Sequence, residues 1–401
     1  MRILYLVHQF FPRYYTGTER LTLDLARQMQ KMGHYPTVLT YDPNSGIEGF
    51  ERLAGNVWMK KYSCNGVPVV MVKQNPSRRA YEIFQPSIED AFRKLKLSCD
   101  IVHICHPKWM SAAAKTCKKQ RRPIVLTLTD PWLLCPRETL IDREFRLCEG
   151  PESGTKCVST CGFPPSIAER HRNAMALLDM ADQVVTSSRF TASLFRRNGW
   201  NGNIRIIRHS IDYNFVKPEH WNSANLTFGY IGTIALHKGV HVLVSAFKKV
   251  LSSGALLRVH GSTHQHPDYA MKTLRLAQED KRIQFLPPFD IVSLPTIMKE
   301  ISVLVVPSIY YENYPLVLLI ALAYRVPIIA SRIGGIPEVV QDGTNGFLFE
   351  PGDSNQLAAI IEKITEEPVI VQRLREKIVS PRRIEEEALD YENMYRRLTS
   401  H

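Results

Sequence analysis

Short runs of aliphatic and β-branched residues alternate with helix-like patterns along the chain, and this alternation restarts after the middle of the sequence. The first run is Ile3–Val7, and an amphipathic helix follows from about Glu19 to Met32, where Gly33 closes it. Five further runs in the first half predict strands: YPTVLTY, DIVHICH, PIVLTLTD, ADQVVTSS and NIRIIRHS. Strands that alternate with helices form parallel sheets covered on both faces, so the pattern predicts an α/β fold with Rossmann-like layers.

The restart of the alternation predicts a second domain of the same kind. Residues Ile211–Asn225 are polar, contain Pro218 and lack periodicity, so we interpret them as a linker. The strands predicted after the linker are LTFGYIG, ALLRVHG, RIQFLP, ISVLVVPS and VPIIAS. A chain of 401 residues is too long for one compact core and suits two. We therefore predict a first domain at 1–210, a second at 226–380 and a C-terminal helix at 381–401.

The composition argues against a membrane-spanning protein. Hydrophobic residues make up 44% of the chain and charged residues 22%, which is typical of soluble globular proteins. No apolar stretch reaches the roughly 18 residues that a transmembrane helix needs. The N-terminal stretch MRILYLVHQFFP has no small-residue cleavage site after it, so we interpret it as a buried strand and expect a cytoplasmic protein.

The chain is strongly basic, with a net charge of +12 and a cluster, KTCKKQRR, at Lys115–Arg122. Such a surplus suits a nucleic acid, an anionic membrane surface or a phosphate-bearing substrate. A solvated helix face explains the cluster equally well, and the charge pattern alone leaves these alternatives open.

Cysteines are numerous and unevenly spaced. The chain has eight, and without secretory features this indicates reduced thiols rather than a disulfide scaffold. Four of them form a group: Cys135, Cys148, Cys157 and Cys161. The closing C-x-x-x-C pair is compatible with a zinc ligand hairpin, whereas the other two gaps depart from zinc-finger spacing. The alternatives are a structural zinc or other metal ion and an irregular loop with free or paired thiols.

Glycine-containing loops follow two predicted strands of the second half. The first loop, Gly232–Gly239, has the sequence GTIALHKG and leads into a helix. Its glycines let the backbone approach an anion, the helix N-terminus offers N–H groups, and Lys238 adds a positive charge. The loop is neither a Walker A loop nor the dinucleotide fingerprint, so a tight turn with a surface lysine remains an alternative. A second loop of this kind contains Gly334–Gly335 and precedes a helix predicted at Pro337.

One acid, Glu312, lies between the strand ISVLVVPS and a helix that starts near Pro315. An acid near a helix N-terminus is favoured by the helix dipole, which contributes under about 1 kcal/mol. Open parallel sheets also bind ligands beyond the carboxyl ends of their strands. Glu312 can therefore equally accept hydrogen bonds from the hydroxyls of a ligand.

Three tracts in combination resemble the retaining GT-B glycosyltransferases of family 4, enzymes that move a sugar from a nucleotide diphosphate donor to an acceptor. The tracts are YYTGTERLTLDLARQMQKMGH, IGTIALHKGVHVLVSAF and VPSIYYENYPLVLLIALAYRVPIIASRIGGIPEVVQDGTNGFLFEPGD, and the resemblance covers nearly the entire chain. The tract LTDPWLLCPRETL, with the cysteines after it, also resembles a subset of the family with a cysteine-bearing insert. The resemblance implies two Rossmann-like domains that face each other across a cleft, with the C-terminal helix packed back on the first domain.

The resemblance also implies roles for individual residues. Lys238 would neutralise the donor diphosphate and Glu312 would meet hydroxyls of the transferred sugar. Asp130 lies in the loop that carries a His-Asp pair in the family, and it completes the implied catalytic set. The donor-binding positions that the resemblance implies are Gly17, Gly232, Thr233, Lys238, Glu312, Pro315, Leu316, Ile320, Gly334 and Gly335. The implied mechanism is front-face substitution with retention, in which electrostatic stabilisation of the leaving diphosphate suffices without a metal ion.

Three positions depart from the family pattern. Thr233 stands where the family usually has an arginine, and Thr129 stands where a histidine precedes the aspartate. Ile320 stands where a second glutamate binds the ribose hydroxyls of the donor. Isoleucine cannot accept a hydrogen bond, and a buried hydroxyl left unsatisfied costs roughly 1–3 kcal/mol.

We therefore expect a retaining glycosyltransferase that uses a nucleotide diphosphate sugar and a glycan or lipid-linked acceptor, in the synthesis of cell-surface polysaccharide or glycoconjugate. An anionic membrane surface is an expected further partner, which would place the protein peripherally at the inner face of the membrane, whereas no nucleic acid partner is expected. The three departures support an alternative, a catalytically impaired relative that binds a glycan, a lipid-linked acceptor or a partner enzyme.

Overall fold

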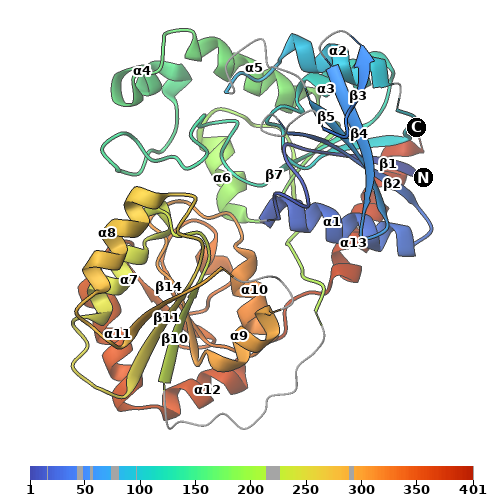
Figure 1. The fold of residues 1–401 in the computed structure, drawn as a ribbon. Coiled ribbons are helices and arrows are strands. Elements are labelled where there is room, and N and C mark those ends of the chain that lie inside the picture. The colour runs from blue at the N-terminus through green and yellow to red at the C-terminus, as the bar shows by residue number, and fades with distance from the viewer. Residues whose placement is uncertain are drawn as a thin grey trace. The chain divides into compact units, whose positions relative to one another are not determined.

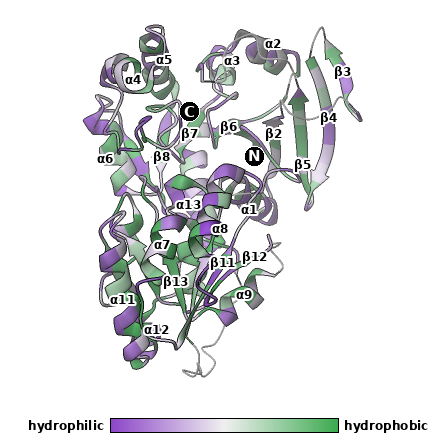
Figure 2. Cartoon of the chain, turned by 60° about the vertical axis from the view of Figure 1, so that its left-hand side comes forward, coloured by the Kyte–Doolittle hydropathy of each residue, from purple (hydrophilic) through white to green (hydrophobic). Residues whose placement is uncertain are grey.

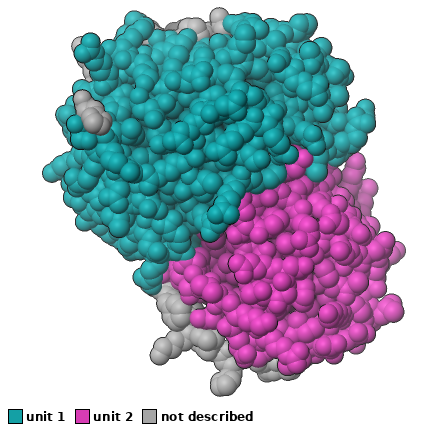
Figure 3. Space-filling model, turned by 180° about the vertical axis from the view of Figure 1, so that it is seen from behind, with its two compact units in different colours: residues 1–212, 382–401 teal, residues 213–381 magenta. Residues whose placement is uncertain are grey.

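The computed structural model describes residues 1–15, 17–42, 48–54, 57–73, 81–95, 97–213, 226–288 and 293–400. The chain divides into two compact units, which Figure 3 colours teal and magenta. Unit 1 comprises Met1–Asp212 together with Arg382–His401, and unit 2 comprises Tyr213–Pro381. The division therefore falls at Asp212 and Pro381, where the sequence predicted boundaries at 210 and 380. Most of the predicted linker lies outside the described residues.

Unit 1 is built on a nine-stranded sheet with the strand order β3-β4-β5-β2-β1-β6-β7-β8-β9. The central strands β6 and β7 are buried at every position, as expected for parallel strands that helices cover on both faces. The sheet contains the strands β1 (Arg2–Val7), β2 (Tyr35–Tyr41), β6 (Ile101–Ile104), β7 (Ile124–Leu128), β8 (Gln183–Thr186) and β9 (Ile204–Ile206). Its other three strands, β3–β5, lie at one edge and are described below. The helices before the last one are α1 (Gly17–Lys31), α2 (Pro86–Leu95), α3 (Ala112–Lys119), α4 (Thr155–Cys161), α5 (Ile167–Met180) and α6 (Arg189–Arg197).

One edge of this sheet corrects the prediction of purely parallel strands. It consists of β3 (Glu51–Ala54), β4 (Val57–Cys64) and β5 (Val67–Lys73), and β4 runs antiparallel to both neighbours. Lys60 and Lys61 are exposed on β4, so this strand lacks the continuous apolar run that marked the others. Charged side chains near a sheet edge also discourage pairing with further strands.

The last helix, α13 (Ile384–Thr399), belongs to unit 1 although the chain reaches it only after completing unit 2. It packs against α1, and the two are drawn red and blue in Figure 1. Its apolar face contributes Tyr391 and Tyr395 to the hydrophobic core that contains β1. The Tyr395 hydroxyl lies 2.6 Å from Nδ1 of His103 on β6, which ties the helix to the middle of the sheet.

Unit 2 is built on a six-stranded parallel sheet with the order β12-β11-β10-β13-β14-β15. The hydropathy colouring of Figure 2 shows hydrophobic strands beside helices of mixed polarity, as layered α/β packing requires. The strands are β10 (Leu226–Ile231), β11 (Ala255–His260), β12 (Ile283–Leu286), β13 (Val303–Val306), β14 (Ile328–Ser331) and β15 (Gly346–Phe349). The helices are α7 (Val240–Phe247), α8 (Pro267–Ala277), α9 (Leu294–Glu300), α10 (Leu316–Ala323), α11 (Ser354–Glu366) and α12 (Val369–Lys377).

The helix predicted at Pro337 is instead a single 3-10 turn, η3 (Ile336–Glu338). A further 3-10 turn, η2 (Leu236–Lys238), precedes α7. Among the described helices, none combines the length and the apolar composition that crossing a bilayer requires.

Candidate functional site

The strand order of unit 2 reverses between β10 and β13. From β10 the chain builds outward through β11 and β12, and then returns to add β13, β14 and β15 on the other side. Such a reversal leaves a crevice at the carboxyl ends of the two strands, where open α/β sheets bind ligands. Lys238 follows β10 and Glu312 follows β13, so these two residues come from the strands that flank the reversal.

The Lys238 and Glu312 side chains contact each other directly. The Lys238 ammonium donates to Glu312 Oε1 over 2.8 Å and to the Tyr310 hydroxyl over 2.8 Å. Tyr310 in turn donates to Glu312 Oε2, and the Ser308 hydroxyl donates to Glu312 Oε1, both over 2.8 Å. The Lys238 Nζ also lies 4.8 Å from the centre of the Tyr310 ring, within the range of a cation–π contact. We call these four residues the Lys238 cluster.

The Lys238 cluster holds a fixed pair of charges. Burial disfavours charge on both groups, but their mutual attraction outweighs it, so the pKa of Lys238 is raised and the pKa of Glu312 is lowered. The Glu312 side chain is 9% exposed and the Lys238 side chain 27%. The ammonium is therefore the more accessible partner, and it is the group that can meet an anion. Glu312 is its counter-ion, and the role of Glu312 as a sugar-contacting acid stays a prediction.

Two glycines bring backbone close to the Lys238 cluster. Gly239 caps α7 in the left-handed conformation with φ of 71°, and a Cβ there would lie 1.8 Å from the Pro307 carbonyl oxygen. Gly334 has φ of 60°, and a Cβ there would lie 2.3 Å from the Glu312 carbonyl oxygen. The neighbouring Gly335 donates its N–H to that same carbonyl over 2.8 Å. The predicted glycine loops therefore meet the cluster through backbone contacts that only glycine allows.

The remaining predicted donor positions are spread over two units. Pro315 is the N-cap of α10, and the partly exposed residues Leu316 and Ile320 lie on that helix. The Thr233 carbonyl beside Gly232 accepts a hydrogen bond from the Tyr230 hydroxyl over 2.7 Å. The last position, Gly17, begins α1 in unit 1.

A second set of polar side chains lies at strand ends in unit 1. His8 follows β1, His106 follows β6 and Asp130 follows β7, and these strands are neighbours in the sheet. His106 Nε2 lies 2.8 Å from Asp130 Oδ2, and the His8 ring stacks on the His106 ring with centroids 3.9 Å apart. The predicted residue Asp130 thus has an imidazole partner, but it comes from a different strand and not from position 129.

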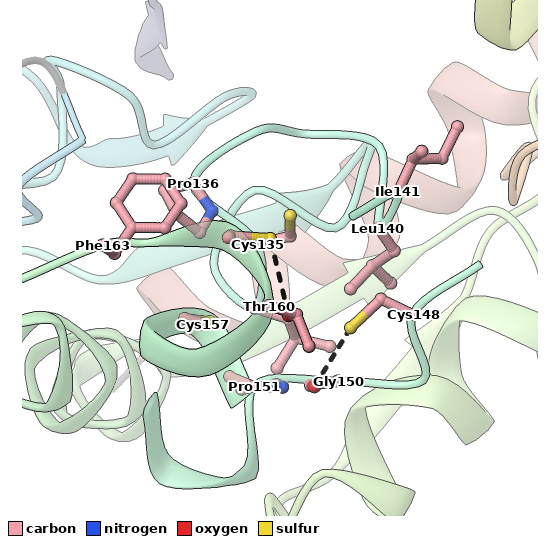
Figure 4. Close-up of a pocket in the computed structure, with 12 residues that line it drawn as sticks. Cys135, Pro136, Leu140, Ile141, Cys148, Gly150, Pro151, Cys157, Thr160 and Phe163 are labelled. Carbon is pink, nitrogen blue, oxygen red and sulfur yellow. Dashed lines mark hydrogen bonds between the residues drawn. The ribbon is translucent and has the colours of Figure 1, made fainter. Parts of the chain in front are cut away.

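The four grouped cysteines converge on one pocket, shown in Figure 4. Cys157 and Cys161 lie one turn apart on α4, and Cys157 Sγ is 3.5 Å from His171 Nε2. The Cys148 thiol donates to the Gly150 carbonyl. All four are free thiols, and burial raises the pKa of Cys157 to about 12. No group of three or more described His, Cys, Asp or Glu side chains has the spacing to hold a metal ion, so the predicted ligand set is not preassembled.

Four contributors to the two polar clusters were not predicted from the sequence: Ser308, Tyr310, His8 and His106. Tyr310 and Ser308 lie two and four residues before Glu312 in the chain. Hydroxyl residues at this distance from an acid in a loop form no recognisable motif, so the sequence did not single them out. His106 is separated from Asp130 by 24 residues. A signal for His106 did exist, since it ends the predicted strand run DIVHICH just as Asp130 ends the run PIVLTLTD.

Two family models match the chain. The model described as Glycosyltransferase Family 4 matches residues 15–215, and the model described as Glycosyl transferases group 1 matches residues 225–367. Together they cover most of both units.

Individual relatives and solved structures agree with these models. The D-inositol 3-phosphate glycosyltransferase of Mycolicibacterium smegmatis is 27% identical over 229 residues, which are 53% of this chain and 52% of that protein. The N-acetyl-alpha-D-glucosaminyl L-malate synthase of Bacillus anthracis is 33% identical over 163 residues, 39% of this chain and 42% of that protein. The chain thus matches about half the length of these curated relatives, or less.

The fold is shared more widely than the sequence. The crystal structure of Anabaena HepE in complex with UDP and glucose aligns with a TM-score of 0.71, at 18% identity and over 98% of both chains. With two units built on mainly parallel sheets, the fold is that of the GT-B glycosyltransferases. From the family models and this fold, the chain belongs to glycosyltransferase family 4.

Proposed function

We propose that the protein is a retaining glycosyltransferase that binds a nucleotide diphosphate sugar at the Lys238 cluster of unit 2. The observation that carries the proposal is the position of Lys238, a charged and accessible ammonium at the strand reversal where α/β sheets bind ligands. Two glycine-bearing loops and the N-terminus of α7 lie beside it, which suits a diphosphate. The relatives and the UDP complex of Anabaena HepE support this class of donor.

The finer parts of the proposal concern mechanism and acceptor. Lys238 would stabilise the charge that develops on the leaving diphosphate, while Glu312 keeps the ammonium charged and in place. Retention of the anomeric configuration and a glycan or lipid-linked acceptor in cell-surface polysaccharide synthesis rest on the family resemblance.

Titration calorimetry with UDP, ADP, GDP and their sugars tests the proposal, followed by assays of donor hydrolysis. We expect at least one nucleotide to bind and its sugar to be hydrolysed slowly in the absence of an acceptor. Failure of every nucleotide to bind would contradict the proposal and favour the alternative of a non-catalytic glycan-binding or partner-binding relative. Nucleotide binding without turnover would support a catalytically impaired protein.

Replacing Ile320 by glutamate should tighten nucleotide binding about tenfold, because it supplies a charge-assisted hydrogen bond to the ribose hydroxyls. Ile320 is only partly buried on α10, so a longer polar side chain can reach solvent or ligand without being trapped in the core. Calorimetry measures the change, with Ile320→Leu as a packing control that leaves affinity unaltered and Ile320→Gln as a neutral acceptor with a smaller gain. Equal affinity in all four proteins would mean that the ribose lies elsewhere.

The proposal also includes an anionic acceptor or membrane surface facing the basic segment Lys115–Arg122. Its support is the net charge of +12 and the exposure of Lys118, Lys119 and Arg121 at and after the end of α3. Lys118 lies 2.7 Å from Asp182, and Lys119 lies 3.9 Å from Glu89. Part of the charge is therefore neutralised within the protein, which also fits the simpler interpretation of a solvated helix end.

For the cysteine pocket, a structural zinc or other soft metal ion stays a proposal. Its support is the convergence of four thiols on one pocket and the position of His171 Nε2, 3.5 Å from Cys157 Sγ. Binding would require the thiols to deprotonate and move inward. We expect stoichiometric zinc in the purified protein, its loss in a Cys157→Ser/Cys161→Ser variant and its retention in Cys64→Ser. Metal-free wild-type protein, measured by elemental analysis after purification without chelators, would rule the site out.

A further inference from the structure

Unit 1 has its own strand reversal, between β1 and β6. The chain places β2 on one side of β1 and then returns to add β6, β7, β8 and β9 on the other. His8 and His106 follow the two strands that flank this reversal, and Asp130 follows the next strand, β7. By the same rule that locates the Lys238 cluster, these three side chains lie where unit 1 would bind a ligand.

The hydrogen bonds around His106 determine which ring nitrogen carries the proton. The backbone N–H of Lys108 donates to His106 Nδ1 over 3.2 Å, so Nδ1 is an acceptor and is unprotonated. The proton of the neutral ring is therefore on Nε2, which lies 2.8 Å from Asp130 Oδ2 and donates to it. The two hydrogen bonds together orient the Nε2–H of His106 at the Asp130 carboxylate.

Packing fixes the orientation of the His106 ring. The ring is buried, with the His8 ring stacked at 3.9 Å and the Trp132 ring at 6.1 Å between centroids. His8 is held neutral, because burial and the nearby Lys108 ammonium lower its pKa. His8 Nε2 is 3.8 Å from Glu19 Oε1 on α1, which places a buried acid beside the stack. The stack therefore leaves His106 little freedom to rotate away from Asp130.

Asp130 retains capacity for a ligand. Its Oδ1 accepts the Trp132 N–H over 2.8 Å and its Oδ2 accepts from His106, which leaves each oxygen a further lone pair. The Asp130 side chain is 32% exposed, whereas the His106 side chain is 2% exposed. The carboxylate can thus receive hydrogen bonds from outside, and the imidazole cannot.

We propose that His106 is a positioning residue that orients the Asp130 carboxylate to accept a hydrogen bond from a sugar hydroxyl during the transfer reaction. The inference deepens the proposed function and rests on it. The hydroxyl belongs either to the transferred sugar or to the acceptor. His106 touches neither, and acts through Asp130 alone.

Two variants separate the hydrogen bond from the bulk of the ring. In His106→Gln the side-chain amide reaches the position of Nε2 and can donate to Asp130, whereas in His106→Asn it reaches only the position of Nδ1. We expect His106→Asn to lower kcat/KM for transfer by about tenfold to a hundredfold, and His106→Gln to stay within about threefold of wild type. Nucleotide affinity, measured by calorimetry, should be unchanged in both, since the Lys238 cluster lies in unit 2. Unaltered turnover in His106→Asn, or equal loss in both variants with matching urea midpoints, overturns the proposal.

Comparison of two assays identifies the hydroxyl. If Asp130 meets the transferred sugar, His106→Asn slows donor hydrolysis and transfer alike. If it meets the acceptor, only transfer slows.

A spectroscopic measurement keeps the inference separable from the proposed function. In protein labelled with ¹⁵N-histidine, we expect the His106 signal, assigned by its absence in His106→Asn, to show protonated Nε2 and unprotonated Nδ1 at neutral pH. A proton on Nδ1 or a doubly protonated ring would overturn the proposed orientation of Asp130, whether or not a donor is found. Absence of nucleotide binding in wild type would instead overturn the proposed function.

Discussion

Replacing Lys238 by methionine is expected to lower turnover of the nucleotide diphosphate sugar by about 10²–10³-fold, the effect of removing one preorganised stabiliser of transition-state charge. Methionine keeps most of the length of the stem, but it removes the charge that the diphosphate would meet and the cation–π contact with the Tyr310 ring. Steady-state assays with a saturating acceptor measure the loss. Lys272→Met on the exposed surface of α8 is the matched control and should leave turnover unchanged. Turnover within about threefold of wild type would mean that Lys238 does not contact the diphosphate.

The same substitution should also destabilise unit 2, because it leaves the Glu312 carboxylate buried without its cation. The lowered pKa of Glu312 in the wild type reflects stabilisation that is present above its unfolded pKa and is lost as the pH falls through the folded value. A Lys238→Met/Glu312→Gln variant removes the unpaired charge, so we expect stability to recover while turnover stays low. Recovery of both stability and turnover would show that Lys238→Met lost turnover because the protein unfolded.

Replacing Gly239 by alanine is expected to produce the second large effect, a loss of unfolding free energy together with a loss of nucleotide binding. The left-handed conformation costs an alanine about 1–2 kcal/mol. The Cβ would also lie 1.8 Å from the Pro307 carbonyl oxygen, and relieving such overpacking costs a further 1–3 kcal/mol, approximately. Gly239 directly follows Lys238, so any shift of the turn moves the ammonium away from Glu312.

Gly343 offers a matched control for this substitution. It has the same φ of 71° as Gly239, but no atom lies within 4 Å of a Cβ built there. Gly343→Ala therefore carries the conformational cost without the contact, and should keep nucleotide affinity. Urea unfolding and calorimetry on both variants measure the difference. Equal effects in the two would indicate that the turn at Gly239 has room to relax.

Much of the fold follows from local sequence. Buried apolar runs such as those of β6 and β7 predict parallel strands, because only a sheet covered on both faces excludes polar residues at every position. Loops that follow such strands predict ligand sites, and this rule selected Lys238 and Glu312, whereas Asp130 came from the family resemblance. The antiparallel strand β4 was not predicted, because its exposed lysines interrupt the apolar pattern.

The partners of the site residues required the strand order. His106 contacts Asp130 because β6 and β7 are neighbours in the sheet. Lys238 contacts Glu312, 74 residues further along the chain, because β10 and β13 are neighbours. Alternating patterns predict strands but do not order them. The antiparallel edge of the first sheet and the packing of α13 on unit 1 also depend on contacts between residues far apart in the sequence, so local patterns do not predict them.

The position of α13 has a consequence for how the protein is made. Unit 2 is one uninterrupted segment inserted into unit 1, and the helix that supplies Tyr391 and Tyr395 to the first core is synthesised after all of unit 2. During synthesis unit 2 can therefore complete its core while unit 1, although begun first, still exposes the apolar groove that α13 will fill. A premature stop before residue 382 would remove no residue of the Lys238 cluster, yet it would leave the unit that carries His106 and Asp130 unfinished.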